Sequence, residues 1–91
     1  MDIVRSDIVV SLAGRDRGKL FIVLDTEGEF VYLTDGRLRK TEKPKRKKCK
    51  HVRFASSSDS HAAMKIKDGE QATNSEVRRA LNEYAAKAGG F

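Results

Sequence analysis

The chain has 91 residues, of which 38% are hydrophobic and 35% are charged, with a formal net charge of +6 and an isoelectric point near 9.7. This length suits one small domain with a thin core, and the low hydrophobic share predicts that part of the chain lies outside it. No apolar run approaches the ~18 residues of a membrane span, the acidic N-terminus does not fit a signal peptide, and one cysteine excludes an internal disulfide. We expect a soluble, cytoplasmic protein that is a monomer when free.

Three β-rich runs separated by turn signals occupy the first part of the sequence. Residues 8–12 form the first run, residues 20–24 form a continuous apolar run typical of a strand buried on most sides, and residues 30–33 form the third. Gly28 and the Asp-Gly pair at 35–36 mark turns, because glycine adopts positive φ angles without strain. Three short strands at roughly ten-residue spacing predict a small antiparallel barrel.

A strongly basic stretch follows these strands. Between Arg37 and Arg53 there are ten Lys or Arg residues and one acid, Glu42, which gives +9 and leaves −3 for the rest of the chain. Like charges at close range do not help folding, so this stretch indicates a partner of opposite charge, and nucleic acid fits it. The alternative is that the stretch only solubilises the chain.

We expect residues 37–50 to form a basic loop in which Lys45 to Lys48 are solvated. Pro44 cannot donate to a strand ladder, so it should lie in a loop or at a sheet edge. Since the loop has few apolar anchors, we expect it to be mobile without a partner. Residues 50–54 can return to a strand.

The last part of the chain is predicted to contain a connector and a helix. Residues 55–72 are a flexible connector by composition, in which residues 63–68 alternate apolar and cationic side chains and form a possible edge strand. A helix is expected over 73–88, because Thr73 and Glu76 fit a capping box. Its apolar stripe should pack on the barrel or, alternatively, dock a partner protein; Gly89 and Gly90 should end it. The stripe consists of Val77, Ala80, Leu81 and Tyr84.

Residues 8–24, IVVSLAGRDRGKLFIVL, resemble the KOW motif, in which a strand enters a tight glycine-containing loop and leaves in a second apolar strand. Gly18 and Lys19 match the loop glycine and the basic residue after it, and Gly14 stands at the earlier loop position. The basic stretch with KHV at 50–52 is similar to a region of KOW-containing large-subunit ribosomal proteins of the archaeal and eukaryotic type. The sequence most resembles their short bacterial relatives, the KOW-domain RNA-binding proteins, which are small ribosomal-protein-like chains.

The resemblance covers residues 6–54 and implies an SH3-like antiparallel β-barrel over residues 3–54, RNA binding and association with the translation machinery. A small barrel can hold the two loops side by side, with loop glycines that let backbone N–H groups approach a phosphate and Arg forks that match its oxygens. The candidate RNA-binding residues are Arg15, Arg17, Gly18, Lys19, Arg37, Arg39, Lys40, Lys43, Lys45, Arg46, Lys47, Lys48, Lys50, His51 and Arg53.

We therefore expect a mainly β RNA-binding module with a C-terminal helix that recognises the backbone and shape of ribosomal RNA, since aromatic side chains for base stacking are scarce. The alternative is a protein-interaction adaptor of the transcription or translation machinery, with a ribosomal protein among its possible partners. DNA binding suits the charge, but no recognition helix is evident. We expect no enzyme, cofactor or metal: Cys49, His51 and His61 fit no common zinc spacing, and Cys49 lacks a positioned base.

Overall fold

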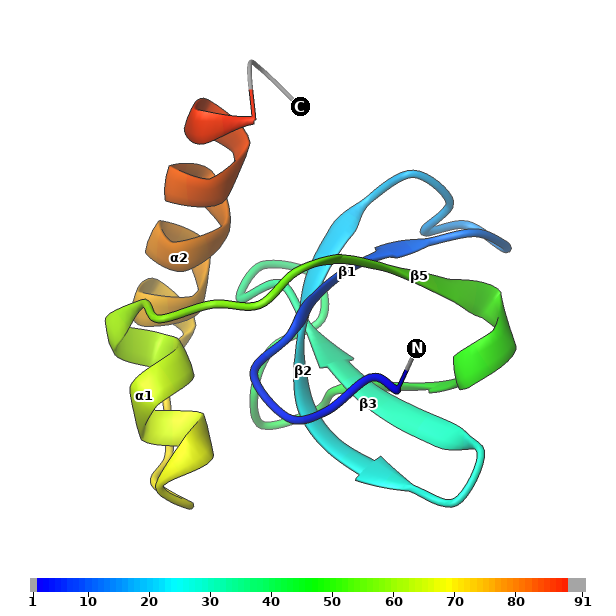
Figure 1. Cartoon of the computed structure of the whole chain (residues 1–91), viewed down its shortest axis with the longest axis horizontal. Coiled ribbons are helices and arrows are strands. Elements are labelled where there is room, and N and C mark those ends of the chain that lie inside the picture. The colour runs from blue at the N-terminus through cyan, green and yellow to red at the C-terminus, as the bar shows by residue number, and fades with distance from the viewer. Residues whose placement is uncertain (1, 89–91) are drawn as a thin grey trace.

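The computed structural model describes residues 2–88, which form a five-stranded sheet on one side of the molecule and two helices on the other (Figure 1). The sheet has the strand order β4-β3-β2-β1-β5, and every neighbouring pair is antiparallel. The elements are β1 (Ile8–Ser11), β2 (Leu20–Glu27), β3 (Phe30–Thr34), β4 (Lys45–Lys48), the 3₁₀ helix η1 (Cys49–His51), β5 (Val52–Ser56), α1 (His61–Lys67) and α2 (Asn74–Lys87).

The first three strands lie where the sequence predicts them, and both faces of the sheet are apolar. Successive residues of a strand point to opposite faces, so the run at 20–24 contributes to two cores. The first, which we call the sheet core, contains Val9, Phe21, Val23, Val31, Leu33 and Val52. The second, the helix core, joins Ile8 and Ile22 to Ala62, Ala63, Ile66, Ala72, Val77, Ala80 and Leu81. The prediction of a strand buried on most sides is confirmed for β2, because Phe21, Ile22 and Val23 are all fully buried.

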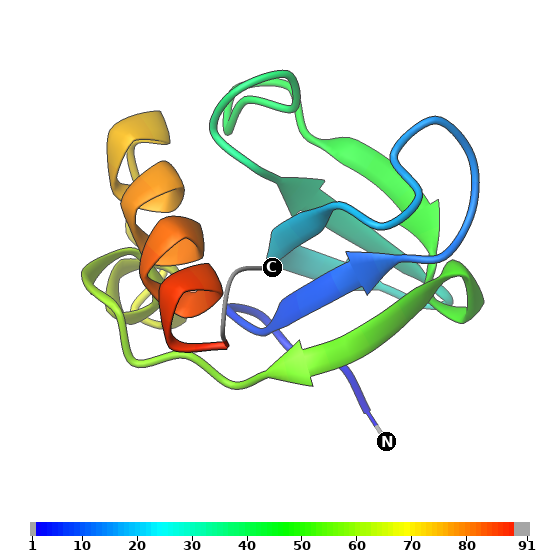
Figure 2. The ribbon, with the colours of Figure 1, turned by 90° about the horizontal axis from the view of Figure 1, so that it is seen from above.

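The sheet is open, so a closed SH3-like barrel is not confirmed. Within residues 2–88, β4 and β5 are the two edge strands and are not hydrogen-bonded neighbours of each other. Figure 2 shows the twisted sheet from above, with the helices beside it. The short η1 turn connects the two edges directly, since β4 ends at Lys48 and β5 begins at Val52.

The expectation that Lys45 to Lys48 are solvated loop residues is wrong. They form β4, which pairs with β3 from Leu33 opposite Lys45 to Phe30 opposite Lys48. A lysine-rich strand is compatible with this position because a lysine stem can cover apolar surface while its ammonium group reaches water. Pro44 immediately precedes β4, at an edge of the sheet as expected.

The possible edge strand at 63–68 is also wrong, because these residues belong mostly to helix α1. The Ser60 side chain caps the helix by accepting a hydrogen bond from the Ala63 backbone N–H. Ala62, Ala63 and Ile66 are buried in the helix core, a spacing that fits helical rather than strand periodicity. The stretch at 55–72, expected to be a connector, thus supplies part of a core.

Helix α2 begins as predicted, with a capping box between Thr73 and Glu76. The Thr73 backbone N–H, followed by the Lys65 ammonium group, lowers the pKa of Glu76 to about 2. The Glu76 carboxylate also accepts contacts of 3.0 Å from both Lys65 and His61, and so ties α2 to α1. The apolar stripe of α2 packs into the helix core, as expected, while Gly89 and Gly90 lie outside the described residues. Among residues 2–88, no helix is long and apolar enough to cross a membrane.

Candidate nucleic-acid interface

Two cationic connections lie side by side at one end of the sheet. The β1–β2 loop (residues 12–19) leads into the start of β2, and the β3–β4 loop (residues 35–44) follows the end of β3, which pairs with the start of β2 through Ile22 and Thr34. Arg39 Nη2 donates across the two loops to Asp16 Oδ2 at 3.1 Å. The prediction that the fold brings these two loops together is therefore confirmed.

The β1–β2 loop is closed by its own backbone hydrogen bonds. The Gly18 N–H donates to the Ser11 carbonyl at 2.8 Å, the Lys19 N–H to Asp16 at 2.9 Å, and the Arg17 N–H to Gly14 at 3.2 Å. The positive φ of Gly18, 83°, makes this closure possible. These three N–H groups are already satisfied, so the expected contact of loop N–H groups with a phosphate is not offered at them.

The β3–β4 loop is held from within around Asp35. One carboxylate oxygen, Asp35 Oδ1, accepts from the backbone N–H groups of Arg37 at 2.8 Å and Arg39 at 2.9 Å. The Thr34 hydroxyl donates to the Arg39 carbonyl at 2.6 Å. The loop has few apolar anchors, as its sequence indicates, but these hydrogen bonds hold it instead.

The same loop is also tied to α2. Arg78 Nη1 donates to the Gly36 carbonyl at 2.6 Å, and the Thr41 N–H donates to Asn74 Oδ1 at 2.8 Å. Asn74 Nδ2 in turn donates to Glu42 Oε1 at 2.5 Å. The hydroxyl of Thr41 and then the amide of Asn74 lower the pKa of Glu42 below its usual value. The only acid of the basic stretch is thus kept ionised and engaged beside the helix.

Strand β4 divides its four cations between two faces, because directly opposite residues of an antiparallel pair share a face. Lys45 and Lys47 stand opposite Leu33 and Val31, both of which belong to the sheet core. Both lysines are half-buried, and Lys47 Nζ donates to the Ala13 carbonyl at 2.8 Å. This bond is a second link between the basic stretch and the β1–β2 loop.

Arg46 and Lys48 lie on the other face of β4. The Arg46 guanidinium carbon lies 3.5 Å from the ring centroid of Phe30, a cation–π contact. Lys48 Nζ lies 3.6 Å from Glu29 Oε1 in an exposed ion pair. The four consecutive cations therefore lie on two faces of the strand and do not form one continuous charged surface.

The last candidates flank the start of the β1–β2 loop. The His51 carbonyl accepts from the Leu12 N–H at 2.8 Å, and Arg53 stands opposite Val10 in the β1–β5 ladder. His51, like Arg39, Lys45 and Lys47, is half-buried. The exposed candidates are Arg15, Arg17, Gly18, Lys19, Arg37, Lys40, Lys43, Arg46, Lys48, Lys50 and Arg53.

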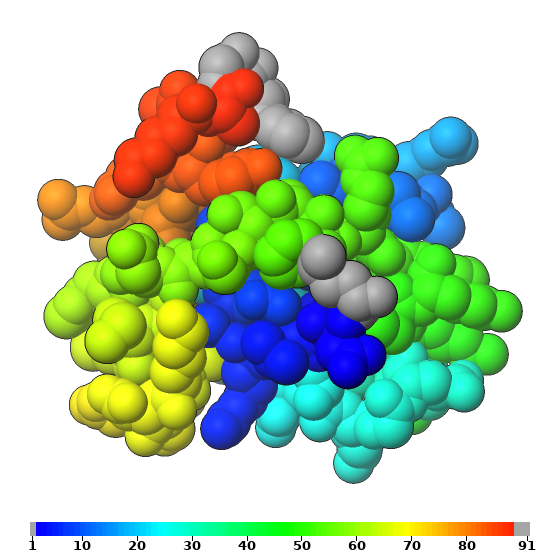
Figure 3. Space-filling model, viewed as in Figure 1, coloured from blue at the N-terminus to red at the C-terminus, as the bar shows by residue number. Residues whose placement is uncertain are grey.

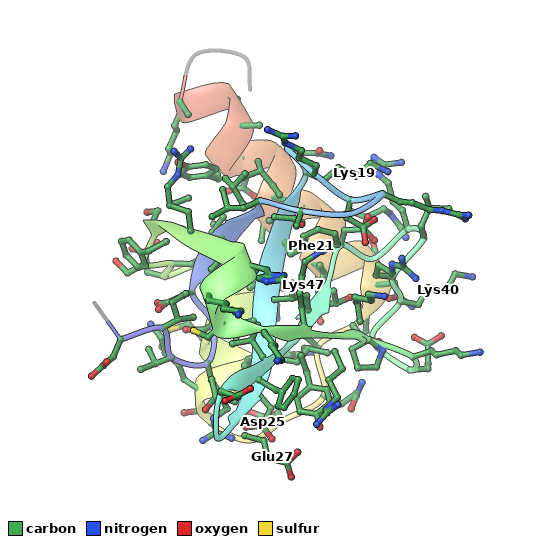
Figure 4. All side chains as sticks on the ribbon, turned by 90° about the vertical axis from the view of Figure 1, so that its right-hand side faces the viewer. Lys19, Phe21, Asp25, Glu27, Lys40 and Lys47 are labelled. Carbon is green, nitrogen blue, oxygen red and sulfur yellow. The ribbon has the colours of Figure 1, made fainter. Side chains whose placement is uncertain are left out.

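Figure 4 shows how the charges are distributed over the molecule. Among the labelled side chains, Lys19 lies near the top of this view and Lys40 at its right, Lys47 lies near the centre, and Asp25 and Glu27 lie at the bottom, where β2 meets the hairpin turn. In Figure 3, α1, α2, β5 and the residues before β1 cover much of the visible face, and the β2–β3 hairpin (cyan) lies at its lower right. The exposed cations of the two loops and the acids of the β2–β3 hairpin thus occupy separate regions.

Sequence reasoning missed Asp16, Thr41 and Asn74 as the residues that hold the cationic loops in place. Thr41 and Asn74 are 33 residues apart, so no local pattern could have paired them. Cys49 is half-buried against the sheet core, as a packing residue would be. Within residues 2–88, no three His, Cys, Asp or Glu side chains are grouped where they could hold a metal ion. No protein-family profile matches the sequence, and no curated protein matches it either.

Proposed function

We propose that this protein is a cytoplasmic RNA-binding module of the KOW type, associated with the ribosome or with ribosomal RNA. The observation that supports it most is the pair of cationic loops, which are joined by the bond from Arg39 to Asp16, while Lys47 of β4 bonds to Ala13 of the β1–β2 loop. Ordered cations on two adjacent loops fit the spaced phosphates of a folded RNA better than those of one extended strand. The module acts by binding, as a monomer when free, and performs no catalysis.

The fold that we infer for it is an SH3-like arrangement in which the edge strands β4 and β5 do not pair with each other. Support comes from five short antiparallel strands around their own apolar core and from η1, which carries the chain from one edge strand to the other. In this arrangement the KOW-like loop and the β3–β4 loop stay together, because both lie at the same end of β2 and β3.

The physical basis of the affinity is the release of counterions from RNA. Each Lys or Arg that neutralises a phosphate releases condensed cations, so the interaction weakens as salt rises. If about five of the exposed cations engage, the logarithm of the association constant falls with the logarithm of salt at a slope of roughly −3 to −5. Binding of this kind reads the shape of the RNA and requires no base-specific contact.

The ribosome association is tested by sucrose-gradient profiles of the tagged protein from cell lysate, at low and high salt, with and without nuclease. We expect co-migration with ribosomes or one subunit that is lost at high salt. A triple variant of exposed loop cations, R37E/K40E/K43E, should move to the top of the gradient. A control with the same change in net charge at exposed cations outside both loops, R5E/K67E/K87E, should still co-migrate.

The competing function is a protein-interaction adaptor. One of its proposed contacts, the apolar stripe of α2, is packed in the helix core, which leaves the sheet edges β4 and β5 as its contact surface. A complex that survives both nuclease and high salt would favour the adaptor. Migration at the top of the gradient in every condition would contradict ribosome association.

A further inference from the structure

A groove of about 370 Å³ lies between α2 and the two cationic loops. Each of the three elements contributes one wall: Lys19 and Leu20 from the β1–β2 side, Arg37 and Leu38 from the β3–β4 loop, and Arg78 and Asn82 from α2. Its volume falls within the range of about 300–1,000 Å³ that small-ligand pockets occupy. No local sequence pattern indicates this groove, because its walls come from three separate parts of the chain.

The groove carries a net positive charge, because the three cations that line it outnumber its one acid. Lys19, Arg37 and Arg78 are the cations on its walls, and Asp35 is the acid. The Asp35 oxygen Oδ1 accepts two backbone hydrogen bonds of its own loop, so that carboxylate is partly occupied. Arg78 is held in place by its bond to the Gly36 carbonyl. The groove therefore suits a ligand that carries negative charge.

The groove also has an apolar component beside these charges. Leu38 is 77% exposed, the most exposed large apolar side chain described, and it lies in the middle of the cationic loop. Leu20 and Leu81 line the same groove and are half-buried and buried, respectively. Binding of an RNA backbone alone makes no use of an exposed leucine next to lysine and arginine, whereas a ligand that is charged at one end and flat and apolar at the other uses both.

We propose that the groove binds a single unpaired nucleotide, bulged or terminal, of the RNA that the two loops bind. Its phosphate contacts Lys19 and Arg37, and its base lies against Leu38 and the plane of a guanidinium group. The Asn82 side chain, exposed on α2, has two donors and an acceptor with which to meet the base edge. Bases within an A-form helix are not accessible in this way, so the nucleotide must be unpaired. The inference rests on the proposed function and adds the feature of the RNA that is selected.

The test compares the binding of two RNA hairpins by fluorescence anisotropy at fixed salt: one fully paired, the other identical except for a single bulged nucleotide, made with each of the four bases. The natural chain should bind at least one bulged hairpin roughly tenfold more tightly than the paired hairpin, as one base resting on a side-chain surface allows. The exposed-site variants Leu38→Ser and Asn82→Ala should each reduce that preference. Neither should change the affinity for the paired hairpin.

Met64→Ser serves as the matched control, because Met64 is 50% exposed on α1 and does not line the groove. It should keep the full preference for the bulged hairpin. Equal binding of paired and bulged hairpins by the natural chain, or an unchanged preference in both groove variants, would overturn the groove inference and leave the RNA-binding proposal intact. Failure to bind any hairpin even at low salt would overturn both.

Discussion

The β2–β3 turn and the pair of cationic loops lie at opposite ends of the same two strands and are built differently. The turn has only Gly28 and Glu29 between the strands; the Tyr32 hydroxyl donates locally to Glu27 Oε1 at 2.8 Å, and the Glu29 carbonyl accepts from the Cys49 N–H at 2.7 Å. The cationic loops are held by partners distant in sequence, on each other, on β4 and on α2. Both ends have local hydrogen bonds, but the cationic loops also depend on several side-chain partners that are distant in sequence.

The largest expected difference between the two ends is in RNA affinity. The R37E/K40E/K43E variant should lose about 100-fold in affinity for ribosomal RNA at low salt, because three phosphate contacts become repulsions. Reversal of the acidic end, E27K/E29K, should change the affinity by less than about threefold in either direction. Filter binding with the same RNA measures both, and equal losses would show that the two ends do not differ in function.

Glycine substitutions sharpen the comparison in terms of stability. Gly36 has a φ of 73°, and a Cβ there would overlap the Asn74 carbonyl oxygen and press on the Arg78 side chain. Gly36→Ala should therefore reduce the free energy of unfolding by about 3 kcal/mol. A Cβ at Gly28 would meet none of the described atoms within 4 Å, so Gly28→Ala should cost only the strain of its positive φ, about 1 kcal/mol. Urea unfolding followed by circular dichroism measures both, and equal costs would contradict the close approach of the loop to α2.

The ion pair at the cationic loops should contribute more to the free energy of unfolding than the ion pair at the β2–β3 turn. The Asp16 side chain is 8% exposed in its pair with Arg39, so Asp16→Asn should lower stability by about 1–2 kcal/mol. Glu29 and Lys48 are 69% and 46% exposed, so Glu29→Gln should cost less than about 0.5 kcal/mol. The same unfolding experiment compares the two variants, and a cost at Glu29 as large as that at Asp16 would contradict the account.

The smallest effect concerns two adjacent lysines of β4. Lys47 is bonded to the β1–β2 loop, and Lys48 pairs with Glu29 of the β2–β3 turn. Lys47→Met retains the apolar stem but removes the bond to the Ala13 carbonyl, so amide hydrogen exchange in residues 12–19 should accelerate about fivefold. Lys48→Met removes only the exposed pair with Glu29 and should leave exchange in that loop unchanged. Hydrogen exchange read by NMR or mass spectrometry distinguishes the two, and similar rates would show that Lys47 does not hold the loop.

The elements that the sequence predicted correctly are those whose structure depends on residues close together in the chain. The apolar run of β2 and the capping box of α2 lie within a few residues, so the sequence alone was enough to find them. β4 was missed because a run of four cations shows no apolar alternation, and it becomes a strand only through pairing with β3. α1 was missed because its short buried stripe depends on a helix core that forms only in the folded chain.

For the candidate interface, the sequence identified which residues carry charge but not where each one points. It treated the cations of the basic stretch as equivalent, whereas the structure places Lys47 under the β1–β2 loop and Lys48 beside the acidic turn. Register in a sheet decides such differences, because neighbouring residues of a strand face opposite ways. That Arg78 and Asn82 line one groove with the loops follows from the position of α2 against them, which is a tertiary property.

The most direct test is the salt dependence of binding to fragments of purified ribosomal RNA, measured for the natural chain and for R37E/K40E/K43E. We predict a slope of roughly −3 to −5 for the natural chain in a plot of the logarithm of the association constant against that of salt, and a slope shallower by about 2 to 3 for the variant. A slope near zero, or the same slope and affinity for both proteins, would contradict the central claim that the two cationic loops bind RNA through its phosphates.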